Sequence, residues 1–270
     1  MKKFFSLVMA FSCLTLFAQQ EQAHVDDVNY QLNPSDGTAQ VIASSGLSGE
    51  IVIPDKIEVG DKTYTVTEIG EGAFKGCKKL MSIVLPGTLQ HVYRSAFDNT
   101  GVMNNKELWD KGTLIVDGIL IATNKNIKTK YTIPDEVRLV AAGAFENNKT
   151  VEYVILREGL EMLDHGTFMG CKNLGKLKIP ASIQWIGEDV LTNSGIYNNE
   201  KKWRSGKLIV DDCLLATDPK KVTDKNVFKV KKPIRLLASR AFANCNKLRN
   251  VVIPKSVTAI STAAFYHCEN

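Results

Sequence analysis

Apolar and polar positions along the chain repeat with a period of 23 residues. The clearest marker follows a small or apolar residue and recurs at Phe74, Phe97, Phe145, Phe168, Leu191, Phe242 and Phe265. Two of the gaps are longer, at 48 and 51 residues, so each equals one period plus an insert. A period of this length is typical of a solenoid, in which each coil buries its apolar face only against its neighbours.

Each period contains a short alternating segment that predicts a β-strand, with apolar residues nine and eleven positions after the marker facing inward. The outward residues of four such strands are Ser82 and Val84, Tyr153 and Ile155, Lys176 and Lys178, and Asn250 and Val252. We expect these residues to line one parallel sheet. On it, Val84, Ile155 and Val252 either form an exposed apolar strip or simply reflect the preference of β-branched residues for strands.

Other positions of the period predict turns and a second buried side. A second pair of apolar residues, such as Leu89 and Val92, follows each strand and is expected to face inward. Two positions after the marker the chain has Gly76, Asn99, Asn147, Gly170, Asn193, Asn244 or His267, which predicts one short helical turn ended by a left-handed residue. The next position holds Cys77, Thr100, Asn148, Cys171, Ser194, Cys245 or Cys268. We expect these small side chains to hydrogen-bond to turn backbone, and the cysteines to be buried, reduced thiols.

Segments outside the period predict a cap and two inserts. The runs 30–32 and 39–42 flank a turn and predict a hairpin within a capping segment at residues 19–49. Inserts at about 101–130 and 195–227 resemble each other at an offset of 94 residues, and Asp117-Gly118 predicts a tight hairpin turn. The insert aromatics Trp109, Tyr197 and Trp203 are either platforms for a ligand or clamps that hold the inserts onto the solenoid.

The first 18 residues resemble a secretory signal, because Lys2 and Lys3 precede an apolar run that ends in Ala18. Removing them takes two Lys from the formal net charge of +5 and leaves +3, too little to indicate nucleic-acid binding. A basic stretch, Lys220, Lys221, Lys225, Lys229, Lys231, Lys232 and Arg235, is read as a solvated face rather than a polyanion site. No further apolar run reaches membrane length.

No residue pattern points to catalysis, a cofactor or a metal. His24, His91, His165 and His267 are scattered, with no pair at metal-binding spacing. His267-Cys268 occupies the turn positions that hold Gly76-Cys77 elsewhere, so a turn explains it better than a nucleophile. We therefore predict no catalytic, cofactor-binding or metal-ligating residue.

The strings Ile69-Gly70-Glu71-Gly72-Ala73-Phe74-Lys75-Gly76-Cys77 and 251–268 resemble the BspA-like leucine-rich repeat, over roughly residues 50–270. The resemblance implies a β-rich α/β fold: a curved leucine-rich-repeat solenoid of 23-residue coils with a parallel sheet, short helical turns and two β-hairpin inserts. Members are typically bacterial surface or secreted proteins, some of them adhesins for host extracellular-matrix proteins, and the family has no catalytic motif.

These observations predict a non-catalytic binding module, secreted or displayed on the cell surface, that contacts a protein partner through the solenoid surface. The partner is unidentified, and a host extracellular-matrix protein is one possibility that the resemblance implies. The alternatives are a glycan-binding protein that uses Trp109, Tyr197 or Trp203, and an architectural spacer.

Overall fold

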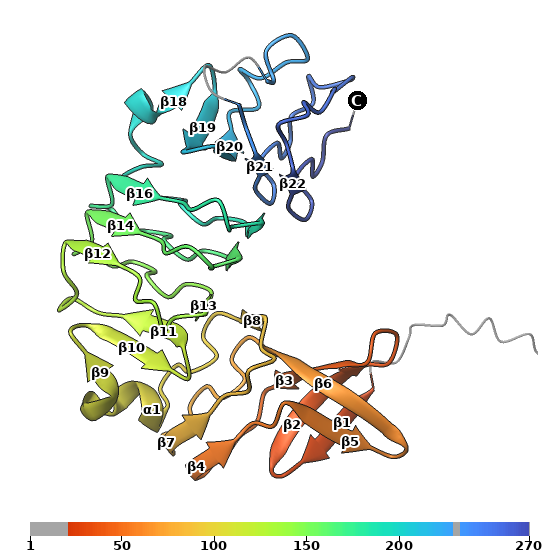
Figure 1. The fold of residues 1–270 in the computed structure, drawn as a ribbon, viewed down its shortest axis with the longest axis vertical. Helices are drawn as coiled ribbons and strands as arrows, with labels where there is room; N and C mark the ends of the chain where they lie inside the picture. The colour runs from red at the N-terminus through yellow and green to blue at the C-terminus, as the bar shows by residue number, and fades with distance from the viewer. Residues whose placement is uncertain (1–20, 229–232, 270) are drawn as a thin grey trace, which may run out of the picture.

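The computed structural model describes residues 21–228 and 233–269, and the expected export signal lies outside this part. The chain forms a crescent of stacked coils (Figure 1). The N-terminal hairpins and the last coil lie at its two tips, on the same side of the ribbon. The architecture is β-rich with little helix, as the resemblance implies.

Strands of a mixed sheet form the N-terminal tip. They are β1 (Gln22–Val25), β2 (Val28–Asn33) and β3 (Thr38–Ile42), followed in the sheet by β6 (Lys62–Ile69) and β5 (Lys56–Val59). The predicted hairpin is confirmed as β2 paired with β3. Strand β3 pairs in parallel with β6, so the hairpin lies against the first coil, and the other pairs among these strands are antiparallel. Tyr30 and Tyr64 are 1% and 2% exposed and belong to the core.

The strands on the outer edge of the crescent form two separate sheets. Strand β4 (Ser48–Val52) pairs with β7 (Lys79–Val84), whereas β12 (Lys130–Thr132), β14 (Tyr153–Ile155) and β16 (Lys176–Lys178) form a parallel sheet of their own. The expectation of one sheet is therefore wrong, because the first insert lies between the two (Figure 1). The strand expected at residues 250–253 is absent, and its counterparts one period earlier lie mostly outside the described residues.

The inner edge of the crescent carries two-residue strands, one per coil. They are β8 (His91–Val92), β13 (Leu139–Val140), β15 (Met162–Leu163), β17 (Trp185–Ile186), β21 (Leu236–Leu237) and β22 (Ala259–Ile260). The second residue of each strand is buried except Ile260, which is 52% exposed. The second inward side of the period is thus confirmed in every coil but the last.

Marker side chains stack in a column through the core. The ring centroids of Phe145 and Phe168 lie 4.8 Å apart, and those of Phe242 and Phe265 lie 4.9 Å apart. Phe145 and Phe168 are fully buried. Equivalent side chains therefore lie directly above one another, as the period predicts.

The turn after each inner strand contains two left-handed residues. All seven residues predicted to have positive φ do so, from Gly76 (80°) to His267 (51°). A second left-handed residue lies four positions earlier at Gly72, Ser95, Gly143, Gly166, Asp189, Arg240 and Ala263. The expected helical turn is instead a series of i→i+3 turns. Its alternate N–H groups donate to the next coil, as in Phe74 N to Ala96 O (2.8 Å).

The two inserts share one design. The first contains α1 (Gly101–Asn104), the 3-10 helix η1 (Lys106–Leu108), β9 (Trp109–Asp110), β10 (Thr113–Val116) and β11 (Ile119–Thr123). The second contains η2 (Glu200–Lys202), β18 (Trp203–Arg204), β19 (Lys207–Val210) and β20 (Cys213–Thr217). The predicted hairpin turn is confirmed, with φ of 46° at Asp117 and 73° at Gly118.

Aspartate and arginine side chains tie each insert to the preceding coil. Asp117 Oδ2 accepts a hydrogen bond from the Leu85 N–H at 2.7 Å, and Asp211 Oδ2 accepts from the Ile179 N–H at the same distance. The guanidinium of Arg138 donates to the carbonyls of Leu89 (3.1 Å) and Pro86 (2.7 Å). Arg235 does the same in the second insert region, toward Ile183 (2.6 Å) and Pro180 (3.3 Å).

The small side chain at the expected repeat position hydrogen-bonds to turn backbone in several coils, whereas that of Cys245 contacts the Thr217 hydroxyl. Cys77 Sγ donates to Ser44 O (3.2 Å), Cys171 Sγ to Phe145 O (2.9 Å) and Cys268 Sγ to Phe242 O (3.1 Å). These residues, together with Cys213 and Cys245, are free thiols, and all but Cys268 are buried. The prediction of buried, unbridged cysteines at the repeat position is confirmed for Cys77, Cys171 and Cys245, whereas Cys268 is only half-buried.

Candidate functional site

The outer face of β12, β14 and β16 presents a basic surface around one aromatic ring. The strands pair in register, so Lys130, Tyr153 and Lys176 form one row and Thr132, Ile155 and Lys178 form the next. The Nζ atoms of Lys176 and Lys130 lie 4.5 Å and 5.5 Å from the centroid of the Tyr153 ring. Cation–π contacts of this kind hold the ring upright on the sheet. We call these six residues the sheet face.

The apolar strip predicted along the outer strands does not form. Val84 is 40% exposed but pairs with Val52, which is 59% exposed, in the separate sheet β4–β7. Ile155 is half-buried, and Val252 is 85% exposed in a segment without a strand. The three residues share a repeat position, but the insert and the missing last strand keep them on different surfaces.

The insert aromatics hold the inserts together. The indole N–H of Trp109 donates to Met103 O (3.0 Å), and that of Trp203 donates to Tyr197 O (2.7 Å). Both indoles are half-buried against the core, and the rings of Tyr197 and Trp203 meet edge to face at 5.3 Å. The structure therefore favours the clamp interpretation over the ligand platform, because the polar group of each indole is already satisfied.

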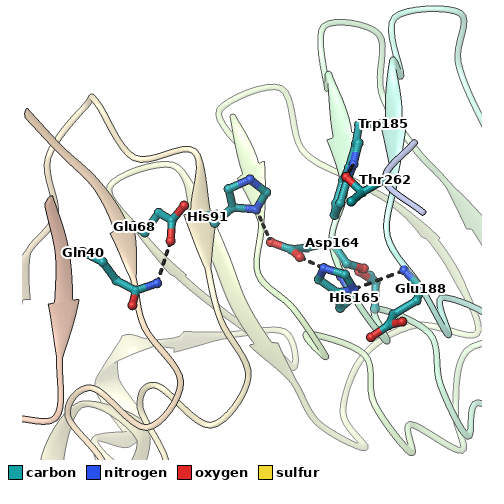
Figure 2. A network of polar contacts seen from close by, with 9 residues as sticks. Gln40, Glu68, His91, Asp164, His165, Trp185, Glu188 and Thr262 are labelled. Atoms are coloured by element: carbon teal, nitrogen blue, oxygen red, sulfur yellow. Dashed lines mark hydrogen bonds and ion pairs between the residues drawn. The ribbon is translucent and has the colours of Figure 1, made fainter. Parts of the chain in front are cut away.

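A second cluster lies on the inner edge of the crescent, where side chains from distant coils meet (Figure 2). His91 on β8 contacts Asp164, which follows β15, with Nδ1 and Oδ2 3.0 Å apart. The ring of Trp185 on β17 meets His91 edge to face at 5.5 Å and His165 at 5.2 Å. Gln40 donates to Glu68 at 2.6 Å at the N-terminal end of the same network.

The pKa values of two titratable groups in this inner cluster are raised by their surroundings. The hydrogen bond to the fully buried Asp164 side chain raises the pKa of His91, against the opposing effect of desolvation. Desolvation, followed by the nearby charges of Glu68 and Asp164, raises the pKa of Tyr93 to about 12. The cluster is therefore a cross-coil contact that strengthens when His91 is protonated.

The sequence alone did not single out the inner cluster. His91 and Trp185 occupy the first position of the two-residue strands, directly before the buried Val92 and Ile186. That position holds Leu139 and Leu236 in other coils, so it shows no consistent polarity. Contacts such as His91 with Asp164 join residues 73 positions apart and depend on the curvature of the whole stack.

Within the described residues, no group of three or more His, Cys, Asp or Glu side chains is placed to hold a metal ion. His267 Nδ1 contacts Glu269 rather than Cys268, whose thiol donates to main chain. Burial raises the pKa of Cys171 and of Cys213 to about 12, which disfavours a thiolate nucleophile at either position. Arg235 of the basic stretch is only 16% exposed and binds Asp212 and main-chain carbonyls, so it is not part of a solvated face.

Comparisons with known proteins agree with this architecture. The family model described as the BspA type leucine rich repeat region matches six copies, over residues 55–119, 121–202 and 220–270. No curated protein matches the chain. In the described part of the chain, no helix has both the length and the apolar character needed to cross a membrane.

Solved structures similar to this chain share less than 20% sequence identity with it. One is a leucine rich cell surface protein from Faecalibacterium prausnitzii, 18% identical over 91% of this chain and 73% of that one, with a TM-score of 0.37. The pneumococcal vaccine antigen PcpA is 13% identical over 92% and 86%, with a TM-score of 0.32. A leucine-rich repeat protein of T. pallidum is 19% identical over 64% and 89%, with a TM-score of 0.33. These values carry no argument about function.

The family match covers most of the chain and coincides with the stacked 23-residue coils of the structure. The protein belongs to the BspA-type leucine-rich repeat family.

Proposed function

We propose that this protein is a non-catalytic, protein-binding module that engages its partner through the sheet face. The observation that carries the proposal is the Tyr153 ring, held between Lys130 and Lys176 on an open parallel sheet. Tyrosine and cationic groups are enriched at the energetic centres of protein interfaces, because they combine apolar area with polar edges. The ring is preorganised, so little side-chain freedom is lost on binding.

The charge of the sheet face indicates the chemistry of the partner. Lys130, Lys176 and Lys178 are exposed, and none of them has an ion-pair partner among the described residues. Three unpaired ammonium groups around one ring favour an acidic protein surface, since opposite potentials speed encounter and suppress wrong partners. An extracellular-matrix protein with an acidic patch meets this requirement.

Export and adhesion are part of the same proposal. Lys2, Lys3 and the apolar run up to Ala18 support secretion, with the mature chain starting near residue 19. On this proposal residues 19–49 cap the solenoid and residues 50–270 display the sheet face at the cell surface. Insert aromatics do not support the glycan alternative, because Trp109 and Trp203 are engaged within the inserts.

The test is the double variant Tyr153→Ala with Lys178→Glu, measured by surface plasmon resonance against a panel of immobilised matrix proteins. We expect binding to weaken by about 2 kcal/mol or more, the size of an interface hot spot. The unfolding midpoint should change little, because Lys178 is exposed and Tyr153 is only half-buried.

The matched control is Lys75→Glu with Tyr266→Ala, which makes the same change of charge and ring count at exposed positions away from the sheet face. The control should bind as the unmodified protein does. Equal binding by the sheet-face variant and the unmodified protein would remove this surface from consideration. Equal losses in both double variants would assign the effect to net charge.

A further inference from the structure

The ladder of main-chain hydrogen bonds between the turns of successive coils stops at both inserts. At a plain step, one coil follows another without an insert, and alternate N–H groups of one turn donate to the next coil. Phe145 N donates to Thr167 O (3.0 Å) and Phe168 N to Val190 O (2.9 Å). The equivalent N–H groups at the insert steps belong to Ser95, Phe97 and Asn99 and to Asp189, Leu191 and Asn193. Among the described residues, none of these six has a hydrogen-bond acceptor.

The facing carbonyls at each insert step lack partners as well. They belong to Ala142, Ala144 and Glu146 at the first step and to Ser239, Ala241 and Ala243 at the second. None of the six accepts a hydrogen bond from a described residue. Buried or half-buried main-chain groups normally have a hydrogen-bond partner, so we expect a ligand or water to bind between the two walls of each gap.

A cleft occupies each gap. The first cleft has a volume of about 270 Å³ and lies between the turns 93–98 and 141–147, with Ile121, Ala122 and Met103 also lining it. The second cleft has a volume of about 280 Å³ and lies between the turns 187–192 and 238–244. Both are closed at the inner edge, by Ala142 N to Val92 O (2.9 Å) and by Ser239 N to Ile186 O (2.8 Å). Either could hold several waters of ~30 Å³ each, or one molecule of amino-acid size.

The walls of a cleft carry opposite partial charges. One wall presents the turn N–H groups and the other the turn carbonyls, because in every bond between successive turns the donor lies one coil before its acceptor. Oriented backbone amides act as fixed partial charges. A ligand that bridges the gap therefore needs an anionic group toward the N–H wall and a cationic group toward the carbonyl wall.

Ion pairs across the two clefts have opposite polarity. In the first, Arg94 stands on the N–H wall and Glu146 on the carbonyl wall, with Nε and Oε2 3.2 Å apart. In the second, Glu188 stands on the N–H wall and Arg240 on the carbonyl wall, 2.7 Å apart. The Arg94 guanidinium crosses to the carbonyl side, where its Nη2 lies 3.8 Å from Met169 Sδ. Glu146 on the carbonyl wall therefore favours a cation in the first cleft, whereas Glu188 on the N–H wall disfavours an anion in the second.

We infer that the first cleft binds a small zwitterion, a free α-amino acid or a molecule with the same pair of groups. Its carboxylate takes the N–H groups of the 95–99 turn, and its ammonium takes the carbonyls of the 142–146 turn and Glu146. Charge-assisted hydrogen bonds of this kind are the strong ones. Asp98 also lines the cleft and weakens its preference for the carboxylate. The site is separate from the sheet face and does not rest on the proposed function.

The test is a titration of the ¹⁵N-labelled protein with L-alanine, followed by NMR. We expect saturable shifts of the amides of Ser95, Phe97 and Asn99, and no equivalent change in the second cleft. Propionate and ethylamine, each carrying one of the two charges, should bind at least about tenfold more weakly, the effect of losing one charge-assisted contact. No saturable shift, or equal affinity for propionate, would overturn the inference and leave the clefts as hydrated gaps.

A variant that exchanges the two charges of the cleft tests ligand recognition separately from folding. The variant Arg94→Glu with Glu146→Arg keeps an ion pair but reverses its polarity, so L-alanine affinity should fall at least about tenfold. Unchanged affinity would contradict the assignment. In case this variant does not fold, Ala122→Leu fills the floor of the cleft without touching a charge and should abolish the shifts, whereas Ala216→Leu, its counterpart in the second cleft, should not. Asp98→Asn should strengthen binding, because it removes a negative charge from the N–H wall.

Discussion

Plain junctions and insert junctions join neighbouring coils through different groups. Between the coils of Phe145, Phe168 and Leu191, each step has main-chain hydrogen bonds and a continuous core column. At the two insert steps that ladder is missing among the described residues, and the side chains of Asp117 with Arg138, or of Asp211 with Arg235, bond to the preceding coil instead. A plain step therefore needs only small and apolar residues at the repeat positions, whereas an insert step needs particular side chains.

The largest expected effect comes from the core column at a plain step. Phe168→Ala should destabilise the protein by ~3–5 kcal/mol, because it leaves a cavity in a fully buried stack. Chemical denaturation measures the change. Phe97→Ala, at an insert step, should cost less, since Phe97 stacks on Phe74 but faces the first cleft on its other side. Equal losses of stability would show that the two kinds of junction do not differ in the core.

The second prediction tests the arginine side chain that bonds to the preceding coil at an insert junction. Arg138→Met removes the donors to Pro86 O and Leu89 O and should cost about 2–3 kcal/mol, since hydrogen bonds from charged groups are worth about 1.5–3 each. Arg235→Met should behave alike, and the exposed Arg204→Met should fall within about 0.5 kcal/mol of the unmodified protein. A loss at Arg204 as large as that at Arg138 would show that net charge, not the bonds to the preceding coil, is responsible.

The third prediction concerns a buried thiol at a plain step, where the expected loss of stability is smaller. Cys171→Ala leaves the Phe145 carbonyl without its thiol donor and should cost about 1–2 kcal/mol. Cys171→Ser keeps a donor and should cost less, since serine already occupies the equivalent position at Ser194. Thermal unfolding of the pair measures the difference. If alanine is tolerated better than serine, the slot is simply apolar.

The smallest effect is a pH dependence at the inner edge of the first insert junction. The pKa of His91 is raised in the folded protein by Asp164, so its contribution to stability is complete below the unfolded pKa of about 6.5 and is lost as pH rises through the folded pKa. The difference in melting temperature between the unmodified protein and His91→Gln should therefore be larger near pH 5 than near pH 8. A pH-independent difference would mean that His91 acts only through packing against Trp185.

Sequence periodicity predicted the parts of the structure that depend on neighbours in the chain. Phe145 and Phe168 stack, Asn99 and Asn147 have positive φ, and Asp117-Gly118 forms the hairpin turn. It also placed Tyr153, Lys176 and Lys178 on one open face. Of the two alternatives for Val84, Ile155 and Val252, the exposed strip does not form, because a shared repeat position does not say whether an insert separates two strands.

The amino-acid sequence determined the coil, its inward residues and its direction of stacking, since those follow from steric preference and apolar periodicity within each 23-residue unit. Only the tertiary structure decided which coils touch, where the ladder is interrupted, and that His91 meets Asp164 and Trp185 across the inner edge. Small angles between successive coils add up along the stack, and two inserts change that sum. Contacts between distant coils are therefore a property of the whole chain, which no single repeat encodes.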